Sequence, residues 1–341
     1  MAAGHLSVSR QYATPERGLV KHIQLCALAA AVAFVARGPI IGAQNVAPPP
    51  RNFRVTLLGT GSPTLSVTRF GPSTLVEAGD QRLVFDAGRG AAQRLQQLGV
   101  PFDRIDAIFL THLHSDHVVG LPDLWLTGWI LGRRTVPWEL VGPTGTAAMA
   151  AHLAQAFAFD IDIRVREGGQ TAAGARLAAR DVAPGVVYER GGVKVTAFLV
   201  DHALVAPAFG YRIDYAGRTV VLSGDTRFSP ALIAVARGAD LLVHEVVLAP
   251  ADVGPSAPYY RAFAHHTTPA QAADVFSRAR PTLAVYSHIV IFGGVEEAEI
   301  LSQTRRGYAG PVLLGYDLMS VAVGDTVATS RPRPATVAPR P

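Results

Sequence analysis

The stretch Thr111–Gly120, THLHSDHVVG, places three histidines and one aspartate within six residues. These residues are His112, His114, Asp116 and His117. The apolar run AIFLT (107–111) leads into the cluster, which predicts a short buried strand that ends at His112. Because alternate residues of an extended chain point the same way, His112 and His114 are expected to share a face. Imidazole and carboxylate groups are ligands that zinc prefers, so the loop predicts a metal site.

Four potential metal ligands within six residues suggest two ions side by side, because adjacent residues cannot easily bind the same ion. Two ions with about four ligands each need roughly three ligands from elsewhere in the chain. Three residues qualify because each follows an apolar strand-like run, as His112 does; they are His202 after VTAFLVD, Asp225 after RTVVLSG and His288 after LAVYS. The carboxyl ends of strands are where α/β folds gather their sites. The sequence therefore predicts a dinuclear site built from distant segments.

The remaining sequence reads as a dense α/β chain in which strands outnumber helices. Strands are expected at 53–59, 73–78, 82–88, 107–111, 193–200, 208–214, 219–223, 240–247 and 283–287. Helices are expected at 90–99, 118–132, 229–237 and 268–279. At 341 residues with 49% hydrophobic content, the chain is long enough for a substantial core and has the composition of a globular protein.

The N-terminal segment carries the pattern of an export signal. Lys21 and His22 precede the apolar run Ile23–Val35, and Gly42-Ala43 offers a cleavage point. We predict a signal peptide over 1–43 and a periplasmic or secreted mature chain without a stable membrane span. An uncleaved inner-membrane anchor or a buried helix is the alternative. The only cysteine, Cys26, lies within this leader, which suits an oxidising compartment.

The other boundaries follow from composition. Residues 44–52, QNVAPPPRN, read as a Pro-rich linker, and residues 53–325 as a single hydrolase domain. The Pro- and Arg-rich segment 326–341 is expected to be disordered. The charge gives little support for a polyanion partner. Without residues 1–43 the chain keeps 27 of its 31 basic residues and 25 of its 26 acidic ones, a balance of +2, and no run of five basic residues occurs.

These motifs resemble the metallo-β-lactamase fold superfamily, closest to its ribonuclease Z and arylsulfatase-like branch. The resemblance spans roughly residues 53–320. It is carried by LLGTGSP (57–63), LVFDAG (83–88), IFLTHLHSDHVVGLPDL (108–124), VGPTG (141–145), VLSGDT (221–226), LLVHEVV (241–247) and HTTPAQAA (266–273). Ala87 and Arg89 in DAGRG depart from the DCGEG-like text of the family. The branch is often dimeric, so the resemblance implies a homodimer.

The resemblance implies a fold and a ligand set. The fold is a four-layer αββα sandwich with the metals at an edge where two sheets meet. One zinc would be held by His112, His114 and His202, the other by Asp116, His117 and His288, and Asp225 would bridge them. Mn²⁺ or Fe²⁺ are alternative ions. Asp86, in the Gly–Asp turn of VFDAG, resembles a residue that orients the ligand loops.

The resemblance also implies a catalytic pair. In the ribonuclease Z branch, a histidine in an H-x-T segment pairs with the glutamate of an HE motif near the leaving group. Glu245 and His266 match these positions. The neighbouring His265 leaves the alignment ambiguous by one residue, although Ala272-Ala273 favours His266. Alternatively, the two histidines simply cap a helix that begins at Thr268.

The implied activity is that of a dinuclear zinc hydrolase, an enzyme in which a hydroxide bridged by two zinc ions attacks an ester. Asp116 would help to steer the proton of that hydroxide. A phosphodiester or related ester in a small molecule is the first hypothesis for the substrate, with nucleic acid less favoured. The alternatives are ribonuclease Z-type processing of tRNA 3′ ends, hydrolysis of an aryl sulfate, lactone or β-lactam, and a non-catalytic or oxygen-reducing di-metal protein. Against tRNA stand the leader and the lack of a Gly- and Lys-rich arm between Gly145 and His202.

Overall fold

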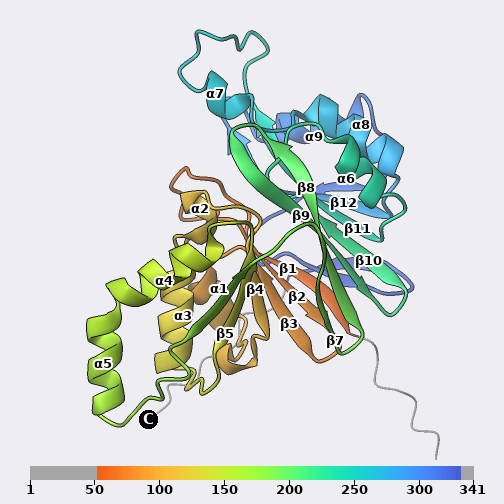
Figure 1. The fold of residues 1–341 in the computed structure, drawn as a ribbon. Helices are drawn as coiled ribbons and strands as arrows, with labels where there is room; N and C mark the ends of the chain where they lie inside the picture. The colour runs from red at the N-terminus through yellow and green to blue at the C-terminus, as the bar shows by residue number, and fades with distance from the viewer. Residues whose placement is uncertain (1–51, 332–341) are drawn as a thin grey trace, which may run out of the picture. The chain divides into compact units, whose positions relative to one another are not determined.

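The computed structural model describes residues 52–331, and within them two β-sheets stack face to face (Figure 1). The strands of the first sheet, in spatial order, are β15 (Val327–Ser330), β14 (Ser320–Val323), β1 (Phe53–Gly59), β2 (Ser73–Ala78), β3 (Gln81–Phe85), β4 (Ala107–Phe109), β5 (Trp138–Gly142) and β6 (Leu177–Asp181). Those of the second sheet are β13 (Val312–Leu314), β12 (Leu283–Ile291), β11 (Leu241–Leu248), β10 (Arg218–Leu222), β9 (Val205–Tyr215), β8 (Val193–His202) and β7 (Gly185–Arg190).

Helices cover the outer face of each sheet. The first sheet carries α1 (Ala91–Gln97), the 3₁₀ helix η1 (Phe102–Arg104), α2 (Ser115–Val118), α3 (Leu121–Ile130), α4 (Thr146–Ala156) and α5 (Ala158–Arg166). The second sheet carries α6 (Pro230–Val235), α8 (Pro269–Ala279) and α9 (Ala298–Arg305), while the short α7 (Tyr260–Phe263) lies in a loop beyond the strands. The layers are therefore helix, sheet, sheet and helix, and the expected four-layer αββα sandwich is confirmed.

Three apolar clusters fill the spaces between these layers, and strand periodicity sorts the side chains among them. In β11, Leu241 and Val243 face the space between the sheets, whereas Leu242 and Val246 face the helices. Both faces of such a strand are buried, which explains its continuous apolar sequence, LLVHEVVL. A third cluster, which includes Trp125 of α3, packs the helices onto the first sheet.

The direction of the strands decides where the site forms. In the second sheet β8 and β10 are each antiparallel to β9, and β10, β11 and β12 are mutually parallel. The strands β8, β10, β11 and β12 therefore all end at one edge of that sheet. In the first sheet β3, β4 and β5 are parallel and likewise end together. Loops that follow these ends can converge, as expected for strand-end residues in α/β folds.

Two expectations need correction. The helix expected over 118–132 is α3, which begins later, at Leu121, because the chain turns at Val119-Gly120 after the short α2. The segment from 326 onward was expected to be disordered, yet Val327–Ser330 form β15, which pairs antiparallel with β14. A four-residue strand is too short to stand out by periodicity, and its hydrogen bonds to β14 are tertiary contacts that composition does not reveal.

The N-terminal predictions fall outside the described part of the chain. Residues 1–51 include the expected signal peptide (1–43) and all of the expected linker except Asn52. Within residues 52–331, no helix has both the length and the apolar character needed to cross a bilayer.

Candidate metal centre and its acid–base pair

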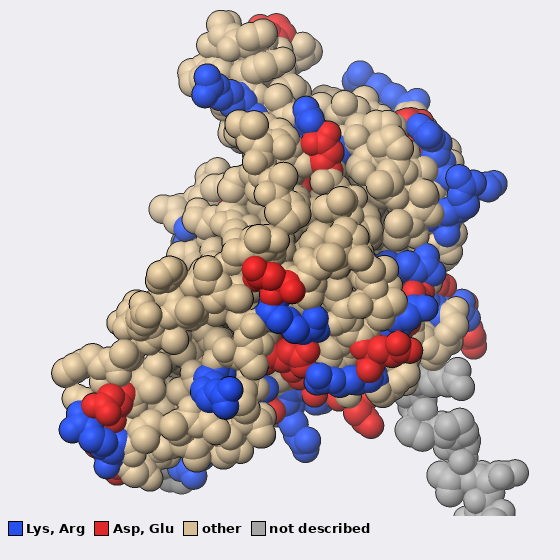
Figure 2. Space-filling model, viewed as in Figure 1, with Lys and Arg blue, Asp and Glu red and all other residues tan. Residues whose placement is uncertain are grey.

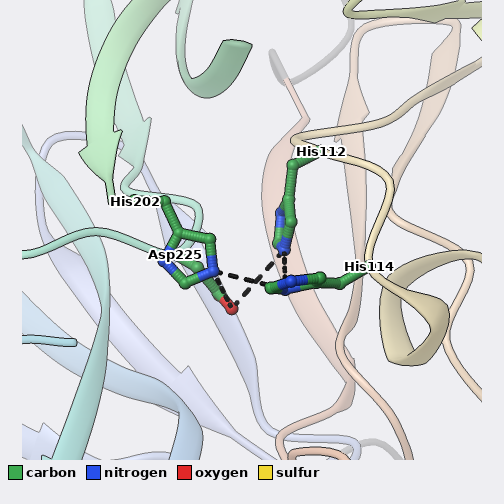
Figure 3. Close-up of side chains that lie close together, drawn as sticks. All are labelled: His112, His114, His202 and Asp225. Carbon is green, nitrogen blue, oxygen red and sulfur yellow. Dashed lines mark hydrogen bonds and ion pairs between the residues drawn. The ribbon is translucent and has the colours of Figure 1, made fainter. Parts of the chain in front are cut away.

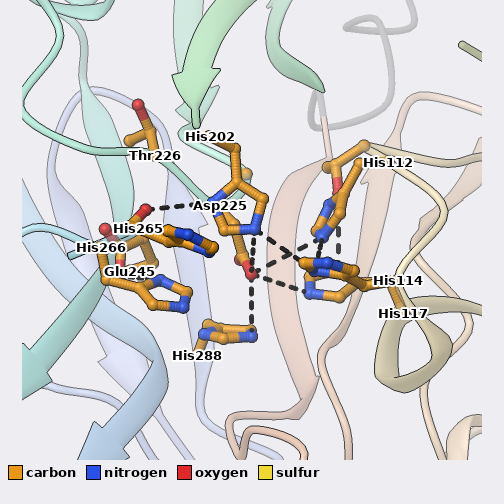
Figure 4. A network of polar contacts seen from close by, with 12 residues as sticks. His112, His114, His117, His202, Asp225, Thr226, Glu245, His265, His266 and His288 are labelled. Atoms are coloured by element: carbon orange, nitrogen blue, oxygen red, sulfur yellow. Dashed lines mark hydrogen bonds and ion pairs between the residues drawn. The ribbon is translucent and has the colours of Figure 1, made fainter. Parts of the chain in front are cut away.

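Asp225 lies at the centre of a cluster of imidazoles contributed by both sheets. Its Oδ2 atom is 3.2 Å from His117 Nε2 and 3.1 Å from His288 Nε2. The same oxygen is 3.7 Å from His112 Nε2 and 3.9 Å from His202 Nε2. One carboxylate oxygen thus faces four ring nitrogens, which is the position that a bridging ligand needs. Figure 3 shows the group on one side of Asp225, and Figure 4 shows the whole network.

Three overlapping groups of potential ligands have donor atoms that lie within 4.8 Å of one another. The first group is His112, His114, His202 and Asp225, the second is Asp116, His117 and His288, and the third is Asp225, His266 and His288. In the first, His114 Nδ1 lies 3.0 Å from His112 Nε2 and 3.3 Å from His202 Nε2. In the second, Asp116 Oδ2 lies 3.2 Å from His288 Nε2. All seven sequence-predicted ligands are brought together, and their division matches the one that the family resemblance implied.

Strand ends and one tight helical turn place these residues. His112 follows β4, and the short α2 then turns Asp116 and His117 back toward it. His202 is the last residue of β8, Asp225 follows β10, and His288 lies in β12. His288 has a positive φ of 44°, in the left-handed region, at the point where pairing with β11 changes register. Most of the ligands are buried, whereas His114 is exposed and forms the open side of the site.

Asp86 ties the ligand loop to the end of β3. Its carboxylate accepts hydrogen bonds from the backbone N–H and the hydroxyl of Thr111, both at 2.8 Å, and lies 2.8 Å from His117 Nδ1. The Thr111 hydroxyl also lies 3.0 Å from His112 Nδ1. Asp86 thus fixes the ring orientation of His117, as the sequence analysis expected, and Thr111 is an additional support that it missed. Thr111 directly precedes the first ligand histidine, and that adjacency was the only available signal.

The pKa shifts favour metal binding by the first group. Burial lowers the pKa of His112 well below its usual value and lowers that of His202 to about 4. Burial alone would raise the pKa of Asp225, but His288 and His117 beside it hold that pKa well below the usual range. These imidazoles are therefore neutral and the carboxylate is ionised at neutral pH. Neutral imidazole and ionised carboxylate are the protonation states that coordinate a metal.

Glu245 and His266 form a pair at the border of the cluster. Glu245 Oε2 lies 3.0 Å from His266 Nδ1, and its Oε1 accepts a 2.7 Å hydrogen bond from the backbone N–H of Thr267. The His266 ring stacks near His288 at a centroid distance of 5.3 Å. Burial would lower the pKa of His266, but the adjacent Glu245 carboxylate raises it to about 9. An imidazolium beside a cluster of metal ligands is suited to give a proton to a leaving group.

His265 has a different position. Its backbone carbonyl accepts a 3.0 Å hydrogen bond from His202 Nδ1, and its ring lies 5.7 Å from that of His202. Glu245 pairs with His266, so the geometry favours the assignment that Ala272-Ala273 suggested. The alternative that the two histidines cap the helix is wrong, because the N-cap of α8 is Thr268, which forms a capping box with Gln271.

The donor set fits divalent metal ions. It offers five imidazoles and two carboxylates, nearly all buried, with one carboxylate oxygen shared between two ligand groups. In metal-binding histidines, the ring nitrogen that faces away from the metal usually has a hydrogen-bond partner. Such partners are present here for the Nδ1 atoms of His112, His117 and His202.

Comparison with known proteins places this arrangement in a class. A family model described as "Beta-lactamase superfamily domain" matches residues 81–289. The metallo-β-lactamase fold protein YhfI from Bacillus subtilis superposes with a TM-score of 0.62 at 20% identity, covering 80% of this chain and 99% of that one. The short form of human tRNase Z superposes with a TM-score of 0.57 at 23% identity, covering 80% of this chain and 99% of that one. This is the metallo-β-lactamase fold.

Sequence relatives narrow the class further. A ribonuclease Z of Mycobacterium avium (strain 104) is 39% identical over 276 residues, which cover 79% of this chain and 98% of the relative. A ribonuclease Z of Mycobacterium marinum (strain ATCC BAA-535 / M) is 36% identical over 277 residues, with coverages of 79% and 98%. The chain belongs to the ribonuclease Z family of metallo-β-lactamase fold proteins and is a metal-dependent hydrolase.

Proposed function

We propose that this chain is an endonuclease of the ribonuclease Z type, which hydrolyses a phosphodiester bond of RNA with two divalent metal ions, zinc in the first place. The observation that carries the proposal is the Glu245–His266 pair beside two groups of metal ligands that share Asp225. This combination provides an acid for a leaving oxygen next to a dinuclear centre. The names of the relatives support RNA, and tRNA in particular, as the substrate class.

Each of the first two groups of potential ligands would hold one metal ion. His112, His114 and His202 would hold one ion, and Asp116, His117 and His288 the other, with Asp225 between them. Bound divalent ions lower the pKa of water and polarise a phosphoryl oxygen, which supplies a nucleophile and stabilises the charge that develops. Asp116, whose hydrogen bond from His288 helps to keep its pKa below the usual value despite burial, is ionised at neutral pH and can accept a proton from the attacking water.

His266 would act at the other end of the reaction. Glu245 holds Nδ1 of His266, which leaves Nε2–H free to donate its proton to the departing 3′ oxygen. A positioned acid of this kind contributes roughly 10²–10⁴ in rate. After the transfer the neutral imidazole must regain a proton from solvent, and its neighbour Glu245 favours that return by stabilising the charged form.

The comparisons favour nucleic acid over the small-molecule ester that the sequence analysis ranked first. The curated relatives match over nearly their full length and are ribonucleases Z. RNA was ranked lower from the sequence because the balance of charge after residue 43 is only +2 and a Gly- and Lys-rich arm between Gly145 and His202 is lacking. Charge patterning reports how a substrate is attracted, whereas the catalytic constellation reports which bond is broken, and here the second criterion is the more specific.

A parallel cleavage assay tests the proposal. Residues 44–341 would be incubated with a tRNA precursor that carries a 3′ trailer, and with bis(p-nitrophenyl) phosphate as a small diester. We expect a single cleavage at the 3′ side of the tRNA body, which chelation abolishes and added zinc or manganese restores. His114→Ala should abolish the same cleavage. Cleavage of the small diester alone, with the precursor intact, would contradict the RNA assignment and leave the hydrolase assignment standing.

One set of observations favours a second candidate, an exported phosphodiesterase for small diesters. The N-terminal pattern predicts export, which would separate the chain from tRNA precursors. On the face in Figure 2, Lys and Arg side chains are scattered and several lie beside acidic ones. Exposed arginines of the described chain pair with neighbouring acids, for example Arg227 with Asp201. Fractionation of expressing cells, together with the assay above, separates the two candidates.

A further inference from the structure

A cavity of about 50 Å³ lies on the inner side of the metal-ligand cluster, between the ends of the two sheets. Apolar side chains such as Phe85 and Leu222 form part of its wall. Polar residues form most of the rest, and four of them matter here, namely Thr74, Ser287, Asp225 and His288. A buried water needs about 10–15 Å³ of such space and two to four polar partners, so the cavity has room for roughly three waters.

Strand periodicity directs both hydroxyl side chains into this space. Thr74 lies in β2, two residues before Val76, which packs in the core between the sheets. Ser287 lies in β12, two residues after Val285, which packs in the same core. Because alternate residues of a strand share a face, Thr74 and Ser287 point between the sheets. A hydroxyl both donates and accepts hydrogen bonds, and water is a partner that can satisfy both roles.

Two atoms of the proposed metal ligands reach this region without a protein partner. Within residues 52–331, His288 Nδ1 and Asp225 Oδ1 are buried and unpaired. The contrast with the other buried ligands is direct, since Thr111 supports His112, Asp86 supports His117 and the His265 carbonyl supports His202. His288 is the buried ligand histidine of this set that lacks a protein group behind it. A metal on Nε2 leaves a proton on Nδ1, which then needs an acceptor.

We propose that the cavity is an internal water-binding site. An ordered water there accepts a hydrogen bond from His288 Nδ1–H and donates one to Asp225 Oδ1. Thr74 and Ser287 hold this water and its neighbours through their hydroxyls. They are positioning residues, because they act on the metal through water and through the two ligands. The water thus binds Nδ1 of His288 as Thr111 contacts Nδ1 of His112 and Asp86 contacts Nδ1 of His117. The inference rests on the metal ligands proposed above.

Structure determination of the metal-loaded protein tests the water directly. At a resolution that shows ordered solvent, we expect a water within hydrogen-bond distance of both His288 Nδ1 and Asp225 Oδ1. A dry cavity, or side chains that close it and pair the two atoms with protein groups, would overturn the proposal. This result is independent of any variant. Failure of the wild-type chain to bind metal would instead contradict the proposed function.

Metal affinity tests the role of the two hydroxyls. The double variant Thr74→Val/Ser287→Ala removes both hydroxyls at nearly constant volume and leaves the water two of its four partners. Changes to groups behind a metal ligand typically lower metal affinity by about 10–100-fold, and we expect a loss in this range by competition with a chromophoric chelator. Each single variant should lose less. The control is Ser320→Ala, which removes a buried hydroxyl that lies 3.0 Å from Thr56 and is not among the residues that line the cavity.

The outcomes of the affinity test separate positioning from general damage. The control should bind metal as the wild type does, although it loses a buried hydrogen bond. Equal affinity of the double variant and the wild type would remove the positioning role. An equal loss in the control would show that the effect is one of stability alone. Near-ultraviolet circular dichroism establishes that each variant is folded, and the single variants carry the test should the double variant fail to fold.

Discussion

At the scale of the residue, two histidines of the same site have opposite pKa shifts. Burial lowers the pKa of His202 to about 4, whereas the Glu245 carboxylate overcomes burial and raises that of His266 to about 9. The first is therefore a neutral ligand at pH 7 and the second a charged acid. Such divergence between neighbouring titratable groups is how environments assign catalytic roles. Both residues were predicted to lie at the site, but only the contact with Glu245 reveals the difference between their pKa shifts.

Replacement of His266 should affect turnover and leave metal binding intact. Because His266 Nδ1 is held by Glu245, we expect His266→Ala to lower kcat for the tRNA precursor by about 10²–10⁴, as for loss of a general acid. The metal content, measured by plasma mass spectrometry, should equal that of the wild type. Loss of metal in this variant would instead make His266 a ligand.

The charge of His266 can be measured in the metal-free protein. Its folded-state pKa is raised from 6.5 to about 9, so the pair with Glu245 stabilises the protein fully below about pH 6.5, and this contribution is lost as the pH rises through 9. We expect an NMR titration of the His266 ring near pH 9. In Glu245→Gln the larger of the two raising charges is gone and only that of Asp225 remains against burial, so the ring should titrate well below pH 9. An unchanged titration would refute the pairing.

At the scale of the element, the loop after β3 and the turn between α2 and α3 support one another. Gly120 N–H donates to the Ala87 carbonyl at 2.9 Å, and Ala87 N–H donates to the His117 carbonyl at 2.8 Å. A Cβ at Gly120 would overlap the carbonyl oxygen of Gly88. This close approach of two backbones holds the turn at residues 119–120, so α3 begins at Leu121 and not at 118 as expected. The pattern of apolar residues continues through the turn, so periodicity could not reveal it.

Gly120→Ala should therefore weaken both the fold and the site. The added methyl must push the two backbones apart, and overpacking of this kind costs roughly 1–3 kcal/mol. We expect a lower midpoint of denaturant unfolding and weaker metal binding, because the displaced loop carries His117 and Asp116. The matched control is Gly238→Ala, at a glycine with no atom within 4 Å of the added Cβ but a φ of 66°, which should destabilise without changing metal affinity. Equal effects on affinity would contradict this account.

Asp86 supports the ligand loop from the other side, at the end of β3. It accepts three hydrogen bonds or close contacts, from Thr111 N–H, the Thr111 hydroxyl and His117 Nδ1. Its φ of 59° suits Asp or Asn better than other residues. We expect Asp86→Asn to fold and to lower metal affinity by about 10-fold or more. Measured by chelator competition, an affinity equal to that of the wild type would show that Asp86 does not orient His117.

At the scale of the whole molecule, the metal centre connects the two sheets. His112, Asp116 and His117 follow β4 of the first sheet, whereas His202, Asp225 and His288 come from the second. Bound ions thus stabilise the packing of one sheet on the other, since a ligand that binds only the folded state adds about 2.7 kcal/mol at 100 times its Kd. We expect chelation to lower Tm and added metal to restore it. A Tm that is independent of metal would contradict this connection.

The sequence predicts the strands that lead to the candidate site better than the region 138–190. The strands that lead to the candidate ligands are apolar runs, and β1 and β2 were predicted with their observed limits. Much of the region 138–190 was not predicted, because β6, β7, α4 and α5 bury few of their residues. The candidate ligands could be proposed because their residue types are rare and clustered. The supports were missed where they are a hydroxyl, Thr111, or a backbone carbonyl, that of His265.

The central claim is that distant segments of this chain hold two divalent ions around Asp225. A zinc titration of the metal-free protein (residues 44–341), followed by isothermal calorimetry, measures the number of metal sites per chain most directly. The account predicts two equivalents per chain, and about one in His288→Ala, because the second group then retains only Asp116 and His117. A wild-type stoichiometry of one or less would contradict it.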